Sequence, residues 1–405
     1  MSISRMMQVL KSPYHLARGV TAYLWFQMFR SKVFIIGVTG TDGKTTTSTY
    51  IYHLLKHAGK RVALISTVSA YVGANEIDTG FHVTTPNPFQ LFRLIRSIEK
   101  QGYEYLVLEV TSHGIDQYRV YGIRPEVAVL TNVTHEHLDY HQTYDRYRNT
   151  KASFLARAKR IALINKSDRS FKDVRAYLKK RQAPVQAYDL TTAPASLKSS
   201  IRRSISETYN QQNMLAGAYT AMAIHISLDN IIEAISTVPK IPGRREVMQT
   251  TPVQVIVDFA HTPNALESSL NSERKSLKLS QKLIAVYGSA GERDVTKRPR
   301  MGEIGARLAD HVVLTTEDPR SERVEEIIKQ MKDGVRTNHG HVYEVLDRRK
   351  AIQFAIEKLA SSGDRVMIYG KGHEKSMNLD GKMETEWSDQ QVVEELLEKN
   401  RNQKK

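Results

Sequence analysis

The chain has 405 residues, of which 40% are hydrophobic and 25% are charged, so it is long enough for two or three domains and is neither disordered nor fibrous. It contains no cysteine, which excludes disulfides, thiolate nucleophiles and cysteine metal ligands. The 59 Lys and Arg residues exceed the 43 Asp and Glu residues, and the resulting net charge of +16 favours anionic ligands such as nucleotides.

The start of the sequence carries an apolar run over residues 20–29. This run is shorter than a bilayer requires, contains Gln27 and leads into a predicted core strand, so we expect neither a membrane span nor a cleaved signal peptide. We predict a short helical segment over residues 1–32 that packs on the next domain, in a cytoplasmic protein. The alternative is weak attachment of the aromatic and basic residues 14–30 to a membrane surface.

Apolar runs rich in β-branched residues alternate with helix-length amphipathic stretches from Val33 onward. The runs lie at residues 33–38, 61–66, 105–110 and 127–132. This alternation predicts an α/β fold with a mostly parallel sheet, and it places a central domain at residues 33–240. The polar stretch 189–204 interrupts the pattern and is expected to be an abbreviated edge region or a loop.

A second alternating series follows the linker residues Pro239, Pro242 and Gly243. Its predicted strands lie at residues 253–259, 283–288, 311–316 and 365–370. We therefore predict a Rossmann-like α/β C-terminal domain over residues 241–405. Ligand sites in such sheets lie at the carboxyl ends of the strands, so side chains at those ends are candidates for function.

The first strand of the central domain is followed by the loop 39–46 and then by a helical stretch. Strand, Gly-rich loop and helix together are typical of a phosphate-binding loop, in which backbone N–H groups face the phosphates. Lys44 would add a positive charge, and the Thr45 hydroxyl could ligate Mg²⁺. The general pattern has Gly where this chain has Val38, so an ordinary Gly-rich turn remains the alternative.

Nine segments identify a wider resemblance. They are GVTGTDGKTT (37–46), EVTSHG (109–114), LTNVTHEHLDYH (130–141), YRNTKASF (147–154), YNQQNMLAGAYTA (209–221), GRRE (243–246), DFAHTPNAL (258–266), GSAGERDVTKRPRMG (288–302) and GKGHE (370–374). In this order they resemble the motifs of the Mur ligases, which use ATP to activate a carboxylate as an acyl phosphate and then join it to an amine. Within the family, they are most similar to the enzymes that add a diamino acid, meso-diaminopimelate or lysine, to a muramoyl-peptide in cell-wall precursor synthesis.

The resemblance implies a P-loop ATPase domain with ATP and two Mg²⁺ ions. It assigns ATP binding to Gly40, Thr41, Asp42, Gly43, Lys44, Thr45, Thr46, Asn210, Asn213, Arg244, Arg245, Asp258 and His261. It assigns catalysis to Lys44, Glu109, His137 and Lys151, and metal binding to Thr45, Glu109, His137 and a CO₂-derived carbamate on Lys151. Without the resemblance, His137 would be interpreted as a packed histidine and Lys151 as a solvated helix lysine.

The substrate sites implied by the resemblance are less regular. Acceptor binding falls on Thr84, Thr85, Ser112 and Arg119, and amine-donor binding on Arg298, Asp318, Arg320, Gly370 and Glu374. Asp318 stands where the family's Asp-Asn-Pro-Arg motif has Asn, and it would add negative charge beside the donor carboxylate. About thirty residues precede the phosphate loop, whereas full-length family members have a separate domain there for the UDP part of the acceptor. We therefore expect an acceptor held without that domain, or a different, lipid-linked acceptor.

Two other functions are compatible with these residues. One is a folylpolyglutamate-synthase-like ligase, which shares the fold and chemistry, and the other is a non-catalytic nucleotide-binding subunit. Glu109, His137 and Lys151 argue against a pure binding subunit, because such a protein needs no second metal site. Nucleic acid is not an expected partner, because the positive charge is not accompanied by a recognisable module. We expect a monomer acting on small molecules.

Overall fold

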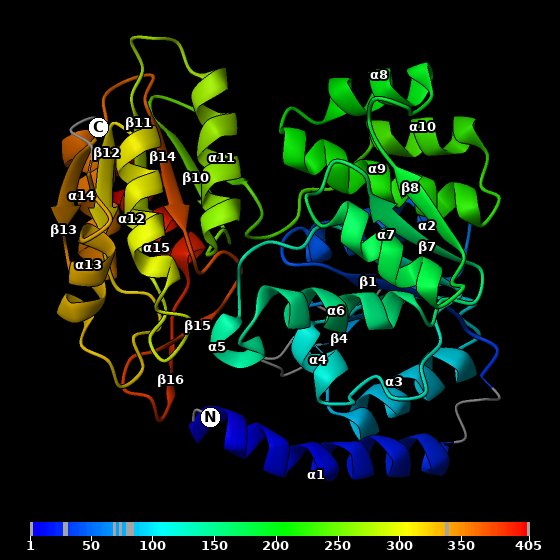
Figure 1. Ribbon diagram of the computed structural model, residues 1–405. Coiled ribbons are helices and arrows are strands. Elements are labelled where there is room, and N and C mark those ends of the chain that lie inside the picture. The colour runs from blue at the N-terminus through cyan, green and yellow to red at the C-terminus, as the bar shows by residue number, and fades with distance from the viewer. Residues whose placement is uncertain are drawn as a thin grey trace. The chain divides into compact units, whose positions relative to one another are not determined.

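The computed structural model describes residues 3–26, 31–67, 70–72, 75–77, 85–336 and 340–402. It divides into two compact units, Met1–Pro239 and Lys240–Lys405. Figure 1 shows each unit as an α/β structure in which helices flank a sheet. Among the described residues, no helix combines the length and the hydrophobicity needed to cross a membrane.

The first unit is built on an eight-stranded sheet with the order β4-β3-β2-β5-β1-β6-β7-β8. The strands are β1 Phe34–Thr39, β2 Val62–Ile65, β3 Ala70–Val72, β4 Asn75–Ile77, β5 Tyr105–Glu109, β6 Val127–Leu130, β7 Ile161–Asn165 and β8 Val185–Tyr188. The six strands from β2 to β8 in this order pair in parallel, whereas β3 and β4 extend one edge in antiparallel fashion. The predicted parallel sheet is thus confirmed, and its central strands are buried because helices cover both faces.

The helices of the first unit include one that the sequence interpretation missed. They are α1 Ile3–Phe26, α2 Lys44–His57, α3 Pro88–Lys100, α4 Ser112–Asp116, α5 Leu138–His141, α6 Tyr144–Leu155, α7 Phe171–Lys180, α8 Ala195–Ser204, α9 Thr208–Ala223 and α10 Leu228–Ser236. The expectation of an edge region or loop over residues 189–204 is wrong for the part that forms α8. Leu197 and Ile201 are buried one turn apart and pack toward α10, which stabilises a helix in a mostly polar segment.

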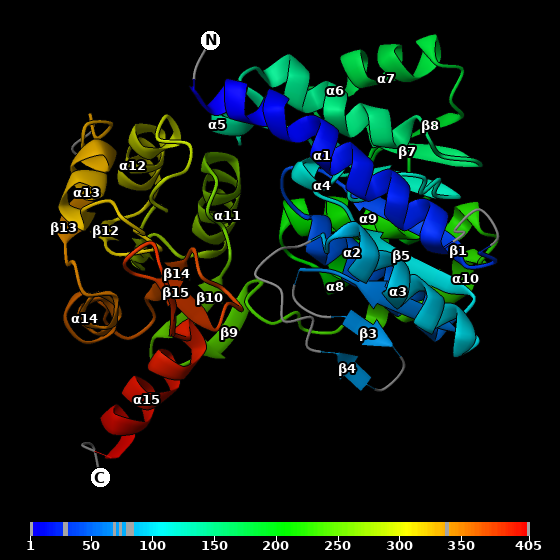
Figure 2. The same ribbon diagram turned by 90° about the horizontal axis from the view of Figure 1, so that it is seen from below.

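Helix α1 lies against α3, and the two helices run side by side in Figures 1 and 2. Ala22 is fully buried, and the ring of Tyr23 lies 6.5 Å from that of Phe92 and 5.9 Å from that of Tyr121. One face of α1 therefore belongs to the core of the first unit, while Trp25 on the same helix remains 76% exposed.

A close contact joins β1 to α6. A Cβ atom on Gly37 would lie 2.5 Å from the Phe154 ring, so glycine at this position allows α6 to approach the strand. Phe154 follows Lys151 by about one helical turn in α6. The same contact therefore fixes how far Lys151 reaches over the loop that follows β1.

The second unit is built on a six-stranded sheet with the order β13-β12-β11-β14-β10-β9. Its strands are β9 Glu246–Gln249, β10 Gln254–Asp258, β11 Leu283–Tyr287, β12 His311–Leu314, β13 His341–Glu344 and β14 Arg365–Tyr369, and the separate hairpin is β15 Ser376–Asn378 with β16 Glu384–Glu386. The helices are α11 Pro263–Ser276, α12 Lys297–Leu308, α13 Val324–Lys332, α14 Arg348–Phe354, the π-helix η2 Ala355–Leu359 and α15 Asp389–Asn402. The predicted α/β fold is confirmed, with the addition of the antiparallel edge strand β9.

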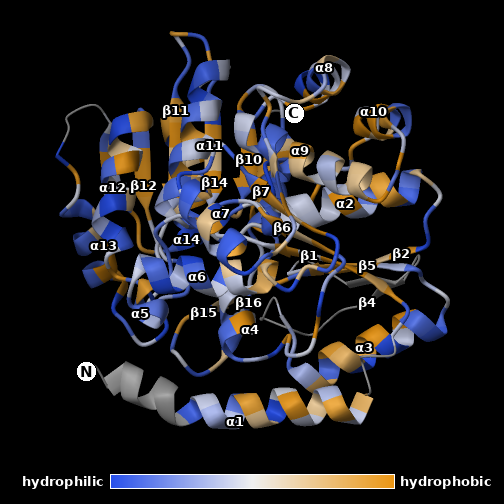
Figure 3. Ribbon diagram, turned by 45° about the vertical axis from the view of Figure 1, so that its right-hand side comes forward, coloured by the Kyte–Doolittle hydropathy of each residue, from blue (hydrophilic) through white to orange (hydrophobic). Residues whose placement is uncertain are grey.

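The core of the second unit lies on both faces of this sheet. Ile256 belongs to one hydrophobic cluster, while its neighbours Val255 and Val257 belong to the cluster on the other face, as alternating side chains of a strand require. Figure 3 shows strands β10, β11 and β14 coloured mostly hydrophobic. Burial on both faces leaves the strand ends as the places where polar side chains can gather.

Candidate active site

The loop between β1 and α2 has the geometry of a phosphate-binding loop. Gly43 precedes α2 with φ of 77°, a left-handed conformation that favours glycine. The Thr41 backbone N–H donates to the Asn132 carbonyl at 3.0 Å, and the Lys44 ammonium donates to the Thr41 carbonyl at 2.7 Å. These hydrogen bonds hold the loop in this conformation, with the N-terminus of a fourteen-residue helix behind it.

Helix α9 brings the two predicted asparagines to this loop. A Cβ atom on Gly43 would lie 2.3 Å from Asn213 Oδ1, so the loop and the asparagine are in close contact. Asn213 Nδ2 donates to Asn210 Oδ1 at 3.2 Å, and the Thr47 hydroxyl donates to Asn213 Oδ1 at 3.3 Å. The loop thus leaves no room for a side chain at position 43, which explains its glycine physically.

Glu109 lies at the carboxyl end of β5, beside the carboxyl end of β1. Its buried carboxylate accepts hydrogen bonds from the Thr45 hydroxyl at 3.0 Å, the Thr67 hydroxyl at 2.9 Å and the Thr67 backbone N–H at 3.1 Å. A carboxylate and a hydroxyl are hard oxygen ligands of the kind that Mg²⁺ prefers. Thr67 was not identified from the sequence, because it follows a different strand.

Lys151 is 1% exposed, so the interpretation of this residue as a solvated helix lysine is wrong. Its ammonium donates to the Gly40 carbonyl at 2.6 Å and lies 4.4 Å from the centroid of the Tyr147 ring. Burial, followed by the nearby charge of Lys44, holds the pKa of Lys151 well below its ordinary value. Lys151 therefore releases its proton more readily than an exposed lysine does, at a position that touches the phosphate loop.

Three histidines gather beside Lys151. His137 precedes α5 with φ of 56°, and its ring centroid lies 4.9 Å from that of His113, which in turn lies 5.7 Å from that of His141. Burial, with the charges of His113 and Lys151, lowers the pKa of His141 to about 3. Neither His141 nor His113 was predicted as a site residue. The four-residue spacing of His141 from His137 could have indicated it, whereas His113 follows a different strand and has no such spacing.

Metal ligands in this region are sparse. Across the described ranges, no group of three or more His, Asp or Glu side chains has a geometry that could hold a metal ion. Mg²⁺ commonly binds through one or two protein oxygens and completes its coordination with phosphates and water. The residues present fit that pattern, because Thr45 and Glu109 place two oxygens 3.0 Å apart beside the phosphate loop.

The predicted acceptor residues lie on neighbouring segments of the first unit. Thr85 Oγ1 lies 3.1 Å from Thr111 Oγ1, and Arg119 donates to the Thr85 carbonyl at 2.7 Å. Ser112 is buried in the first turn of α4, directly after Thr111. Thr84 lies outside the described residues. The structure thus brings Thr85, Ser112 and Arg119 together around one loop.

The predicted ATP-binding residues of the second unit gather at the carboxyl end of β10. Buried Asp258 accepts from the Arg245 N–H at 2.7 Å, and burial raises the pKa of this carboxyl group. The Arg245 guanidinium pairs with Glu273 at 2.6 Å, whereas the Arg244 guanidinium lies 4.1 Å from the centroid of the Phe259 ring. The next candidate, His261, has Nδ1 2.9 Å from the Phe259 carbonyl.

Charged residues of the predicted donor site pair with each other. Asp318 accepts from the Lys371 ammonium at 2.9 Å and from the Asn378 N–H at 3.0 Å. The same ammonium lies 2.5 Å from the Glu374 carboxylate, whose pKa is raised by burial. The expected negative charge of Asp318 is thus offset by Lys371, a partner that sequence reasoning missed because it lies 53 positions away.

The remaining donor candidates differ in their surroundings. Arg320 has φ of 53°, is partly exposed and donates to the Gly291 carbonyl. Arg298 is fully buried and donates to Glu322 at 2.7 Å, to Gln330 at 2.7 Å and to the Ala290 carbonyl at 3.0 Å. Gly370 has φ of 109°, and a Cβ atom there would lie 2.4 Å from a Glu317 carboxylate oxygen.

Comparison with known proteins identifies both units. Residues 38–232 match the Mur ligase middle domain, and residues 243–372 match the Mur ligase glutamate ligase domain. A UDP-N-acetylmuramoyl-L-alanyl-D-glutamate–2,6-diaminopimelate ligase of Clostridium acetobutylicum is 34% identical over 386 residues, covering 90% of this chain and 78% of the relative. The enzyme of that name from Aquifex aeolicus is 35% identical over 397 residues, covering 94% of this chain and 81% of the relative.

Solved structures show the same architecture. A structure of a UDP-N-acetylmuramoyl-L-alanyl-D-glutamate–2,6-diaminopimelate ligase matches with a TM-score of 0.60 at 29% identity, over 93% of this chain and 81% of the other. The Mycobacterium tuberculosis folylpolyglutamate synthase complexed with ADP and AMPPCP matches with a TM-score of 0.67 at 17% identity, over 88% and 92%, which is a likeness of fold. Two consecutive domain matches and relatives at about one-third identity show that the chain belongs to the Mur ligase family of ATP-dependent ligases.

Proposed function

We propose that the protein joins the amino group of a diamino acid, meso-diaminopimelate or lysine, to a carboxylate of a muramoyl-peptide acceptor during cell-wall precursor synthesis. The observation that carries this proposal is the set of polar side chains around the phosphate loop, in which Glu109 contacts Thr45 and Lys151 contacts Gly40. The relatives of one-third identity are named as diaminopimelate ligases, which supports the choice of substrates.

The reaction has two steps. A carboxylate oxygen of the acceptor attacks the γ-phosphorus of ATP, and the bond to the β,γ-bridging oxygen breaks to release ADP. The amine nitrogen then attacks the acyl carbon, phosphate leaves with the bonding pair, and the nitrogen loses a proton. Lys44 and the N–H groups at the start of α2 stabilise the charge on the transferring phosphoryl group.

Two Mg²⁺ ions, when bound, would screen the repulsion between ATP and the acceptor carboxylate. Thr45 and Glu109 would hold one ion, and Glu109, His137 and Lys151 would serve the other. An ammonium at Lys151 would repel a cation, so a CO₂-derived carbamate on this residue is part of the proposal. In that modification, Nζ attacks the carbon of CO₂, a C–N bond forms, an oxygen takes the negative charge and Nζ loses a proton.

The surroundings of Lys151 support the carbamate. Its lowered pKa favours the neutral amine, which is the form that attacks CO₂. Within the described part of the chain, neither ring nitrogen of buried His141 has a hydrogen-bond partner. The ring of His141 lies 5.1 Å from that of Tyr147, which Lys151 also contacts, so an acceptor group on Lys151 would enter a cluster that contains an available donor.

The donor site proposed for the second unit uses Arg320 for a carboxylate and Glu374 for an ammonium of the amino acid. Both side chains are partly exposed, as a ligand contact requires. Arg298, in contrast, is buried and already donates to three groups, so we assign it a positioning role for the segment that carries Gly291.

The test is a phosphate-release screen of the purified protein with ATP and Mg²⁺. UDP-muramoyl peptides are paired with diaminopimelate, lysine and glutamate, and a reduced folate is paired with glutamate. Phosphate release that needs both a muramoyl peptide and a diamino acid supports the proposal. Release with folate and glutamate would instead support the folylpolyglutamate-type reaction, and nucleotide binding without turnover would support a binding subunit.

We also propose that the chain acts as a cytoplasmic monomer, with weak contact between residues 14–30 and a membrane surface as a second possibility. The observation in favour of the contact is that Tyr14, Leu24 and Trp25 on α1 are 58%, 61% and 76% exposed. Co-sedimentation with vesicles containing anionic lipid checks it. Retention of the Trp25→Ser variant equal to that of the unmodified chain would exclude a role for this face.

A further inference from the structure

The face of α1 that points toward the rest of the first unit carries two basic residues. Gly19 and Ala22 are buried on this face, and a Cβ atom on Gly19 would lie 2.6 Å from the Tyr118 carbonyl oxygen. This close approach fixes the position of the helix. His15 precedes Gly19 by four positions and Arg18 precedes Ala22 by four, so helical periodicity puts both on the same side of α1, where apolar residues are usual.

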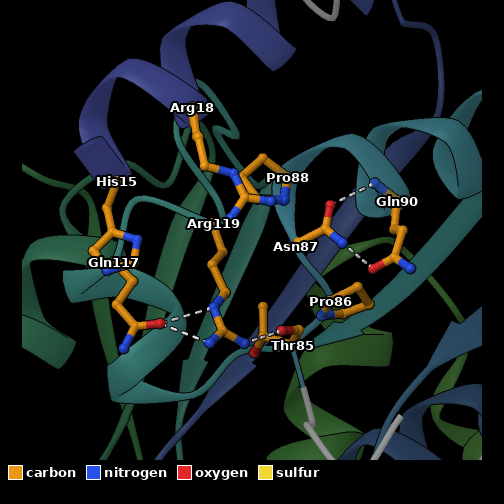
Figure 4. A pocket seen from close by; sticks show the side chains of 9 residues that line it. All are labelled: His15, Arg18, Thr85, Pro86, Asn87, Pro88, Gln90, Gln117 and Arg119. Carbon is orange, nitrogen blue, oxygen red and sulfur yellow. Dashed lines mark hydrogen bonds between the residues drawn. The ribbon is translucent and has the colours of Figure 1, made fainter. Parts of the chain in front are cut away.

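His15 and Arg18 line a cavity of about 270 Å³ in the first unit. Figure 4 shows both side chains, from α1, on one side of the cavity and Arg119 and Thr85 beside them. The cavity also meets the N-terminus of α3, where Asn87 accepts a hydrogen bond from the Gln90 N–H at 3.2 Å. The positive end of this thirteen-residue helix adds to the charge of the arginines.

The charges around the cavity are of one sign. Among the described residues, those that line it comprise two arginines and a histidine but no carboxylate. Arg119 donates to neutral oxygens, those of Gln117 at 2.6 and 3.0 Å and of Thr85 at 2.7 Å. Burial, and then the charge of Arg18, lower the pKa of Arg119. Like charges held together in a cavity are costly unless an anion binds between them.

Asp116 is an acidic residue that acts on His15. Its charge raises the pKa of His15, but burial and the charges of Arg119 and Arg18 have larger effects and lower the pKa overall. Asp116 does not line the cavity, and its carboxylate accepts from the Tyr140 hydroxyl at 2.8 Å and lies 3.7 Å from Arg146. Asp116 is thus paired with groups outside the cavity, and the described residues that line the cavity carry a net positive charge.

We propose that this cavity binds an oxyanion of the acceptor, a phosphate or a carboxylate remote from the reacting one, and that α1 supplies Arg18 and His15 to it. The inference rests on the proposed function for the identity of the acceptor. Arg119 was already a predicted acceptor residue; the new element is that the N-terminal helix completes the site. The Arg18 guanidinium donates to the Tyr14 hydroxyl at 3.4 Å, so its partner, like those of Arg119, is neutral, and both groups offer the parallel N–H donors that oxyanions bind.

Binding of two probes tests the site directly. UDP represents the phosphate source and N-acetyl-D-glutamate the carboxylate source, and calorimetry is done with the nucleotide loop filled by a non-hydrolysable ATP analogue and Mg²⁺. Arg18→Ala should weaken binding of one probe by about ten- to a hundredfold, and Arg18→Lys by less, because it keeps the charge. The probe affected identifies the source of the oxyanion.

Arg93→Ala is the matched control, since Arg93 is an exposed arginine on α3 that does not line the cavity. Thermal unfolding of each variant shows whether α1 stays in place. Absence of saturable binding of both probes, or equal binding by folded Arg18→Ala and Arg93→Ala, overturns the inference.

The ligase assay separates this inference from the proposed function. In a working ligase, Arg18→Ala should raise the KM for the acceptor and leave the KM for ATP unchanged. If no muramoyl peptide is turned over but a probe still binds in a manner that needs Arg18, the proposed function fails and the oxyanion site stands. If turnover occurs and Arg18→Ala leaves both the acceptor KM and probe binding unchanged, the oxyanion site fails alone.

Discussion

The phosphate loop of the first unit and the loops of the second unit that carry Asp318 and Lys371 hold their lysines in different ways. Around the phosphate loop, Lys44 and Lys151 donate to backbone carbonyls of Thr41 and Gly40. In the second unit, Lys371 lies between the carboxylates of Asp318 and Glu374. One site therefore holds its lysines with neutral dipoles, and the other with opposite charges.

This difference matches the ligands proposed for the two sites. A nucleotide brings several negative charges, so the positive charge of Lys44, which donates to a carbonyl group, remains attractive to it. An amino acid is a zwitterion, and a site that binds it needs both signs of charge close together. Removing a charged side chain from the first site should therefore lower turnover strongly. In the second site, removing one charge should also leave its oppositely charged neighbours without that partner.

The largest effect is expected for Lys44→Ala. Loss of its charge should lower ATP turnover by about 10²–10³-fold, because it removes a group that stabilises the transferring phosphoryl oxygens. Phosphate release measures turnover, and circular dichroism checks the fold. Lys56→Ala, at the exposed end of the same helix, is the control. Turnover by Lys44→Ala equal to that of this control would remove the phosphate-loop assignment.

A loss of similar size, about 10²-fold, is expected for Lys151→Ala, because a ligand of the second metal would be missing. Added short carboxylates such as acetate should restore part of the activity, and removal of dissolved CO₂ should inhibit the unmodified chain but not the rescued variant. Lys159→Ala changes an exposed lysine of the same unit and serves as control. Full activity of Lys151→Ala without additive would contradict the carbamate.

These lysines also show what the sequence could predict. The loop 39–46 was recognisable because strand, glycines, lysine and helix follow one another, and Glu109 because it ends a buried strand. Thr67, His113 and the burial of Lys151 were not predictable, since they depend on which strands are neighbours.

A long-range ion pair and a helix with few apolar residues were also not predicted from the sequence. Asp318 was interpreted as a charge facing the donor, but its pairing with Lys371 joins segments that share no local pattern. The helix α8 was missed because Leu197 and Ile201 are few among polar residues, and its burial against α10 is tertiary. Alternating strands and helices, in contrast, predicted the fold because the periodicity is local.

A smaller effect, about ten- to a hundredfold in the KM for the amino acid, is expected for Arg320→Ala, because one charged hydrogen bond is lost. The KM for ATP should not change. Asp318→Asn should raise the donor KM by less, about fivefold, through the loss of the Lys371 ion pair. Steady-state kinetics of both variants are compared with Arg323→Ala, whose side chain is 76% exposed. Equal changes in the KM values for ATP and donor would remove this loop from the donor site.

The smallest effect concerns stability and pH. Burial raises the pKa of Glu317 to about 7, so the native state keeps a proton that the unfolded chain releases above its ordinary value of 4.5. Stability from this group is therefore complete below the ordinary value and is lost as the pH rises toward 7. Glu317→Gln should be more stable than the unmodified chain by about 1–3 kcal/mol at pH 8, and by less at pH 5.

Urea unfolding of Glu317→Gln and of the unmodified chain at pH 5 and pH 8 measures this difference in the free energy of unfolding. Glu322→Gln is a useful comparison, because the hydrogen bond from Arg298 lowers the pKa of Glu322. Stability from that group is present above its ordinary value of 4.5 and is lost only below it, so the effect of Glu322→Gln should be nearly the same at pH 5 and at pH 8. A stability difference between Glu317→Gln and the unmodified chain that does not vary with pH would show that Glu317 is charged in the native state.

The contact between Gly37 and Phe154 has a consequence for mutational tolerance. Neither residue is assigned to a substrate, yet any side chain at position 37 would meet the Phe154 ring and displace α6, and Lys151 with it. A scan of all substitutions should therefore show a second set of intolerant positions, lying behind the reacting groups in the interior. Substitutions at such positions would change the distances between the reacting groups. A search limited to residues that contact ligands would not find these positions.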